Sequence, residues 1–207
     1  MTLTAADGAR VLLTHDGHVT LRKAAVSNGV LEIDGPDADL HIEGAISTRA
    51  GVDIDVANIE QRANILSTEG GIRLAAEERY TALAGTEVRS DVGPILIGGQ
   101  DYVQLSRVLS GYSAASGNAV SIAGRHIRGA GAGTLVQALN GTVSFVGDTL
   151  GTVTGPLQIA AAGLEVKAEQ EAHVYSSQDI YLKQLLGAAS LFDIVAEQDL
   201  ILGEIIC

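Results

Sequence analysis

The fold is decided by residues 65–105, which read ILSTEGGIRLAAEERYTALAGTEVRSDVGPILIGGQDYVQL. Within this stretch, apolar residues recur at alternate positions, as in Ile72-Arg73-Leu74 and Ile95-Leu96-Ile97. A period of two is typical of a β-strand with one buried face, because successive side chains point to opposite sides. The three- and four-residue spacing of an amphipathic helix is mostly absent. The stretch therefore predicts a series of short strands.

These short strands recur about every eight residues. The first apolar position of each unit lies at 65, 72, 80, 88, 95, 103, 112, 120, 127, 135 and 143. Glycine and asparagine stand between the units, as in Gly70-Gly71, Gly93-Pro94, Gly98-Gly99 and Asn140-Gly141. Both residue types tolerate the positive φ that sharp corners often require. Each unit is thus expected to be a strand of four or five residues followed by a tight corner.

This pattern predicts an all-β fold of the β-helix (β-solenoid) class. Three units would make a rung of 24 residues, and 207 residues would give roughly eight to nine rungs. The pattern leaves open whether one chain forms the helix or three chains intertwine as a triple-stranded β-helix. A β-sandwich or an antiparallel barrel fits less well, since the chain has 2 Phe, 5 Tyr and no Trp with which to fill such a core.

The repeat divides the chain into three regions. Residues 1–64 form a less regular N-terminal β region, in which 34–39 are expected to be a corner loop. Residues 65–182 form the regular β-helix of about eight-residue units. Residues 183–207 form an apolar C-terminal cap or assembly segment, and 183–194 are expected to be a short helix or a wide loop. The apolar end suggests that another copy of the chain, or another protein, covers it.

Charge and cysteine content exclude several classes of function. The formal net charge is −12, without a basic run, so binding to nucleic acid is not expected. The only cysteine is Cys207, which excludes an intrachain disulfide framework. No signal peptide or membrane-spanning apolar run is visible, so synthesis in the cytoplasm is expected.

Possible metal ligands are scattered along the chain. The five histidines have no zinc-site spacing, and they are expected to be polar surface residues: His15, His18, His41, His126 and His173. Calcium binding by the acidic segment with Asp34, Asp37 and Asp39 is not favoured, because the order of an EF-hand is absent. The segment Gly98-Gly99-Gln100-Asp101 resembles a calcium roll only in part, since it does not repeat.

Catalytic and cofactor motifs are also weak. The glycine-rich segment 129–134 lacks the Lys-Ser/Thr ending of a phosphate loop and is interpreted as closely packed corners. Asp53 and Glu77 are 24 residues apart and would align as a carboxylate pair if the rung is 24 residues long. Nothing else distinguishes them from other outward acids. The sequence therefore predicts no catalytic residue, no cofactor and no metal site, and the protein is not expected to be an enzyme.

Octad-like units at 71–78 and 164–171 resemble the repeats of β-helical spike proteins of contractile phage tails and type VI secretion systems. In that family three chains form a stiff prism with an aliphatic interior. The resemblance implies a homotrimeric spike or fibre component, contacting other assembly components at its ends, in a virion or injection apparatus. Some family tips bind iron through His-x-His. Here His15 and His18 are three apart and point to opposite faces of a strand, so a metal tip is not expected.

Two alternatives remain open beside the spike. One is a polymerising cytoskeletal scaffold similar to the bactofilins, which share the aliphatic core. The other is an adhesin or a polysaccharide-active solenoid.

Overall fold

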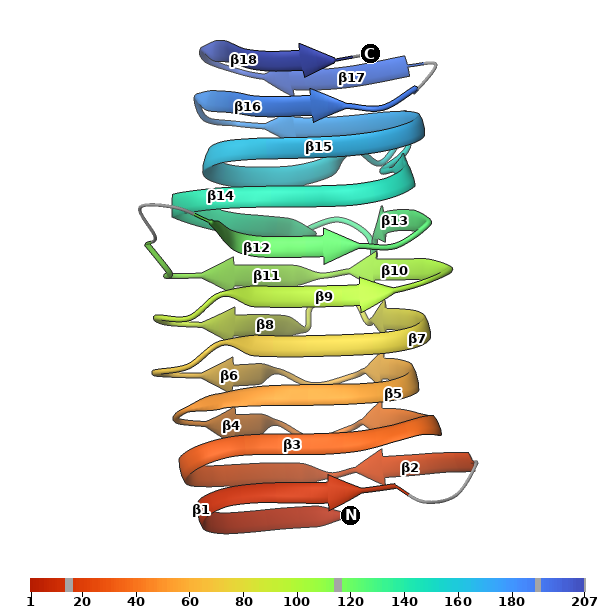
Figure 1. Ribbon diagram of the computed structural model, residues 1–207, viewed down its shortest axis with the longest axis vertical. Helices are drawn as coiled ribbons and strands as arrows, with labels where there is room; N and C mark the ends of the chain where they lie inside the picture. Colours follow the sequence, from red (N-terminus) through yellow and green to blue (C-terminus); the bar gives the residue numbers. More distant parts are fainter. Residues whose placement is uncertain (14–16, 114–116, 189–190, 207) are drawn as a thin grey trace.

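The structure is a computed structural model that describes residues 1–13, 17–113, 117–188 and 191–206. About 75% of the chain is strand, and the described residues contain no helix. The strands wind into a β-solenoid of about nine turns, with the two ends of the chain at opposite ends of the stack (Figure 1). The expected fold class is confirmed.

The structure contains the following strands: β1 Thr2–Leu12, β2 Gly17–Leu21, β3 Lys23–Ile42, β4 Ile46–Thr48, β5 Gly51–Gln61, β6 Ile65–Ser67, β7 Ile72–Ala82, β8 Glu87–Ser90, β9 Ile95–Gly99, β10 Tyr102–Leu105, β11 Arg107–Ser110, β12 Asn118–Ala123, β13 His126–Gly129, β14 Leu135–Leu150, β15 Leu157–Ser176, β16 Ile180–Leu186, β17 Leu191–Ala196 and β18 Leu200–Ile206.

The strands form three faces. In Figure 1 the front face includes β9, β12, β16 and β18, the left face includes β4, β6, β8 and β11, and the right face includes β2, β10, β13 and β17. Long strands such as β3 and β15 bend around corners and contribute to more than one face. Strands inside the stack pair in parallel with strands of the rungs below and above them, for example β7 with β5 and β9. The single chain closes each rung, so the winding is of the single-chain form.

Rung length varies more than the expected 24 residues. Paired residues are separated by as few as 18 positions, between Gly163 and Tyr181, and by as many as 28, between Arg107 and Leu135. The additional residues of the longer rungs lie at corners, where they are not paired with a neighbouring strand. Consequently Val108 and Val136 occupy the core positions that the eight-residue spacing assigned to residues 112 and 135.

Each face buries columns of aliphatic side chains. In one front-face column every residue from rung to rung is at most 2% exposed: Ile33, Ile54, Leu74, Ile97, Ile122, Phe145 and Val166. A one-residue slip would turn such a column to solvent, so burial fixes the register. The core is therefore a continuous hydrocarbon axis along the stack.

A line of small residues forms the corner between the left and front faces. Ser67, Ser90 and Ser110 are stacked and buried. The Ser90 hydroxyl donates to the Gly70 carbonyl at 2.8 Å and accepts from the Gly93 N–H at 2.9 Å. A Cβ on Gly70 would lie 1.6 Å from the Ala50 carbonyl oxygen, so this corner requires glycine.

The stack changes shape towards the C-terminus. The left face ends with residues 157–161, and residues 177–179 and 197–199 then join the right face directly to the front face. The last rungs consist of β16 and β18 on the front and β17 on the right. The expectation of a helix or wide loop over 183–194 is wrong for the described residues. They lie largely in β16 and β17, because they alternate in the same register as the rungs below.

Candidate functional site

The acidic segment near residue 37 does not form a calcium loop. All three carboxylates lie within the continuous strand β3, and no loop exists at 34–39. Asp34 lies on the front face beside Arg10, at 3.9 Å, whereas Asp39 lies on the right face beside His18, at 3.1 Å. The corner between the two faces separates them, so the carboxylates do not converge on one point. No group of three or more His, Cys, Asp or Glu that could hold a metal occurs among the described residues.

Two of the predicted surface histidines meet on the right face. The register places His18 beside Asp39 and His41 beside Glu60. The His18 and His41 ring centroids are 5.2 Å apart, and the His41 Nδ1 lies 3.6 Å from Glu60 Oε2. Each of these two imidazoles therefore has a neighbouring carboxylate as its polar partner. His126, on the same face, contacts Thr149 Oγ1 through Nδ1 at 2.8 Å, and His15 lies outside the described residues.

His173 is an exception to the surface interpretation, which is wrong for this residue. Its side chain is only 1% exposed. Nδ1 lies 3.3 Å from Asp193 Oδ2 in the next rung, and Nε2 lies 3.5 Å from Glu171 Oε2. Nε2 makes no hydrogen bond within the described structure. The residue links β15 to β17, so its contribution is to hold the last right-face strand.

The two glycine-rich segments begin at the ends of strands β9 and β13 and continue into the corners that follow. Gly98 and Gly99 end β9, and Asp101 in the next corner lies 3.7 Å from Arg125. In the segment 129–134, a Cβ on Gly129 would lie 2.8 Å from the Thr134 hydroxyl, which agrees with close packing there. Gly131 has open space around it, so the packed interpretation does not extend to the whole segment.

The proposed alignment of Asp53 with Glu77 is wrong. The rung at this point is 20 residues long, so Asp53 faces Arg73 in the next strand. The Arg73 guanidinium lies 2.8 Å from Asp53 Oδ1 and 2.6 Å from Asp55 Oδ2. The carboxylate therefore faces a cation rather than a second carboxyl group, and no acid–base pair forms at this position.

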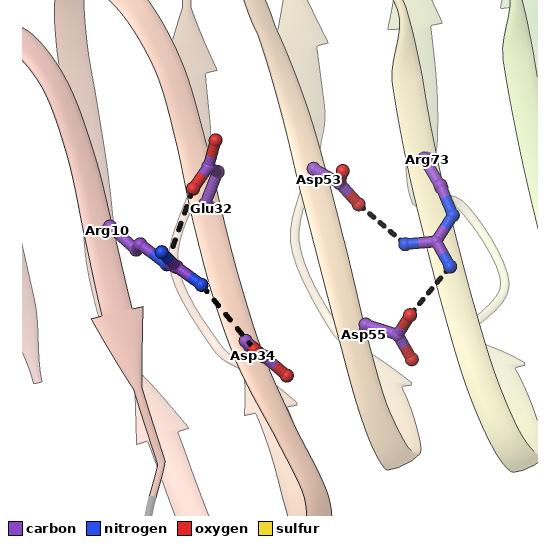
Figure 2. Close-up of polar contacts among 6 residues, drawn as sticks. All are labelled: Arg10, Glu32, Asp34, Asp53, Asp55 and Arg73. Atoms are coloured by element: carbon purple, nitrogen blue, oxygen red, sulfur yellow. Dashed lines mark hydrogen bonds and ion pairs between the residues drawn. The ribbon is translucent and has the colours of Figure 1, made fainter.

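A ladder of charged residues crosses the lower front face, and Figure 2 shows its members pointing outward from neighbouring strands. Arg10 lies 3.5 Å from Glu32 and 3.9 Å from Asp34, and Arg73 contacts two aspartates one rung below it. The side chains line a depression of about 290 Å³. Hydrogen bonds to Asp55 and then Asp53 raise the pKa of the Arg73 guanidinium above its ordinary value.

This ladder braces neighbouring rungs. Its side chains are roughly half exposed, and exposed ion pairs contribute about 0–1 kcal/mol each. The four carboxylates are matched to two arginines, which leaves the group acidic overall. Sequence reasoning missed the ladder because it assumed a constant rung length. The alternation of outward charges in β5 and β7 was visible, but their partners depend on the register.

The uppermost rung has a different character, because its inward residues are exposed. Leu202 and Ile205 occupy the front-face columns of Leu182 and Leu185, which are 2% and 6% exposed. In the last rung the corresponding exposures are 57% and 47%. Leu200, Ile201 and Ile206 are exposed on the same strand. This surface, formed by β17 and β18, is called the upper end below. It was the part of the sequence singled out as an apolar assembly segment.

The lowest rung is the opposite surface, formed by β1 and β2 and called the lower end below. Its inward residues include Leu3, Ala9, Val11 and Val19, which pack against the core on one side and are partly exposed. One edge of β1 pairs with β3, and the opposite edge faces away from the stack with no strand of the described residues beside it. Unpaired strand edges are templates for further β-pairing.

Comparisons with protein-family models, curated proteins and solved structures gave no match. Within the described residues, no helix is long and apolar enough to cross a membrane.

Proposed function

We propose that this protein is a structural building block that assembles with copies of itself through the ends of its β-solenoid. The assembly would be an extended scaffold or fibre of the kind formed by a polymerising cytoskeletal solenoid. In this proposal the protein acts mechanically. Continuous parallel ladders and an aliphatic axis provide stiffness, and no catalytic step is involved.

The observation that carries the proposal is the exposure of core positions at the upper end. Leu202 and Ile205 continue columns that are buried in the rungs beneath them, yet about half of each side chain is exposed to solvent. Burying apolar surface is favourable by about 25 cal/mol per Å². A further rung placed above β18 would cover both residues and pair the free edge of the strand. A second copy of the chain can supply such a rung.

A spike component of a contractile injection assembly is the second candidate. The observation that favours it is the narrowing of the stack from three faces to two beyond residue 161, since a tapering stiff prism suits a penetrating tip. Against the three-chain arrangement of such spikes, each rung here is closed by one chain. A spike would thus require lateral packing of complete solenoids.

Sedimentation velocity and light scattering over a range of concentrations test the proposal. End-on assembly predicts a concentration-dependent series of species above the 21.3 kDa of one chain. A discrete trimer that does not grow would favour the spike instead. A chain that stays monomeric at high concentration would contradict self-assembly.

A pair of variants links assembly to the upper end. Leu202→Lys places a charge on the exposed apolar surface and should shift the distribution to monomers. Val153→Lys is the matched control, because Val153 is 74% exposed in a side loop, between β14 and β15, away from both ends. If the two variants dissociate the assembly equally, the upper end is not the contact surface.

A further inference from the structure

The front-face register places Arg10 and Glu204 in the same outward column, at opposite ends of the stack. Following the paired residues from rung to rung, the column contains Arg10, Glu32, Asp53, Arg73, Leu96, Ser121, Ser144, Glu165, Gln184 and Glu204. A copy placed above the upper end in the same orientation would continue this column. Its Arg10 would then stand next above Glu204.

The inward columns match in the same way. The column that begins with Ala9 ends with Leu202, and the column that begins with Val11 ends with Ile205. In a head-to-tail stack, Ala9 would cover Leu202 and Val11 would cover Ile205. Inward residues would then meet inward residues, and the strands would remain parallel, as they are throughout the molecule.

The charges of the two ends are complementary. Over residues 191–206 the chain carries four acids and no lysine or arginine: Asp193, Glu197, Asp199 and Glu204. The lower end, β1 and β2, carries one arginine, Arg10, and one acid, Asp7, and Arg22 and Lys23 follow at the start of the second rung. Two upper ends brought together would oppose four acids with four acids. An upper end on a lower end brings acids to cations, which favours the encounter.

Glu204 and Arg10 are both free to form an ion pair with each other in such a stack. Glu204 accepts a hydrogen bond from Gln184 Nε2 at 3.0 Å, and among the described residues it has no cationic partner. The Arg10 side chain is 71% exposed, and its ion pairs with described residues are all to acids of the rung above it, Glu32 and Asp34. The required geometry already exists within the molecule, because Arg73 lies 2.8 Å from Asp53, its column neighbour one rung below.

We infer that the assembly is polar: the upper end of one copy binds the lower end of the next, with Glu204 beside Arg10 of the second copy. The partner is thus a second copy of this chain in the same orientation. The inference rests on the proposed function, since it specifies the contact through which the ends assemble.

Site-specific cross-linking tests the polarity. Arg10→Cys and Glu204→Cys are made separately in a Cys207→Ser background, carried on copies of different length, and treated with a short bis-maleimide. Head-to-tail contact predicts a cross-linked dimer only when the two variants are mixed. Cross-linking of Glu204→Cys with itself would show contact between two upper ends and would overturn the inference.

The same experiment separates failure of the inference from failure of the proposed function. If no mixture cross-links but sedimentation still shows assembly, the copies meet elsewhere and the polarity is wrong. If no mixture cross-links and the chain is monomeric, the proposed function itself fails.

Charge reversal provides a second test that does not depend on cysteine. Glu204→Arg and Arg10→Glu alone should each weaken assembly by about tenfold or more, because each places like charges in contact. The double variant Arg10→Glu/Glu204→Arg restores opposite charges and should recover most of the loss. Circular dichroism monitors folding. Arg10→Glu also removes the exposed ion pairs with Glu32 and Asp34, but such pairs contribute only about 0–1 kcal/mol each, so the fold should persist. Failure of the double variant to recover would overturn the pairing.

Discussion

Substitutions at Ile97 and at its neighbour Leu96 test directly which side of a front-face strand faces the core. Both residues lie in β9, but Ile97 is 2% exposed, whereas Leu96 is 45% exposed on the outer side. Ile97 is stacked between Leu74 below and Ile122 above. Removing a fully enclosed isoleucine side chain costs its transfer free energy and leaves a cavity that the flanking rungs cannot close.

The expected loss for Ile97→Ala is about 3–4 kcal/mol, in the middle of the range for such substitutions, because neighbours on both sides are fixed by the ladder and the cavity stays open. Leu96→Ala should cost less than about 1 kcal/mol, since it removes an exposed side chain. Ile97→Asp should prevent soluble folding, because it buries an unpaired charge.

Urea unfolding followed by circular dichroism measures the difference. Stacked repeats can unfold in more than one step, so transition midpoints are compared along with fitted free energies. Similar losses for Ile97→Ala and Leu96→Ala, or a folded and soluble Ile97→Asp, would refute the assignment of the inward face.

Three further predictions concern the corners, a buried phenol and the charge ladder. Gly70→Ala should lower the melting temperature strongly, because its Cβ would collide with the Ala50 carbonyl, whereas Gly98→Ala should be nearly neutral, since its Cβ meets nothing closer than 4.0 Å. Burial raises the pKa of Tyr80 above its ordinary value of about 10, so just above pH 10 this tyrosine ionises only in the unfolded chain, and the free energy of unfolding should fall as pH rises. Tyr80→Phe should flatten this fall in pH-dependent unfolding, and an unchanged slope would contradict the prediction. Arg73→Ala should cost less than about 1 kcal/mol, and unfolding in high salt should reduce the difference; a loss above 2 kcal/mol would mean that the ladder is not solvent-screened.

The strands and the solenoid could be predicted because burial imposes a simple rule on the sequence. Ile72 and Ile95 alternate with outward residues in the same way in neighbouring rungs, and stacking the rungs buries both. The prediction did not need the length of each rung. It needed only the period of two within a strand and a corner after it.

The register between rungs could not be predicted from the sequence. Most contacts of the charge ladder could not be predicted either, because they depend on that register. Insertions at corners change rung length without disturbing the inward pattern, so Asp53 met Arg73 rather than Glu77. The Gly35-Pro36 pair suggested a loop, yet it lies at a bend within β3, where the pairing with β5 shifts register and no N–H of Pro36 is required.

His173 illustrates a further limit. It alternates with the buried residues Ala172 and Val174, so a period of two assigns it to the outer side. It contacts Asp193 of the next rung, which meets it only through the particular length of that rung, and Glu171, which lies two residues before it in the same strand. Pattern reasoning thus identifies the hydrocarbon core but not a polar residue that packs outside it.

Because each strand inside the stack is held only by the rungs directly above and below it, force applied to the two ends of the chain would peel the molecule layer by layer. A layer contains about 20 residues where Ile180 pairs with Leu200. Fully extended, such a segment spans roughly 70 Å. Optical-tweezer traces should therefore contain a series of small length increments, which vary with the 18 to 28 residues of each rung, rather than one large rupture.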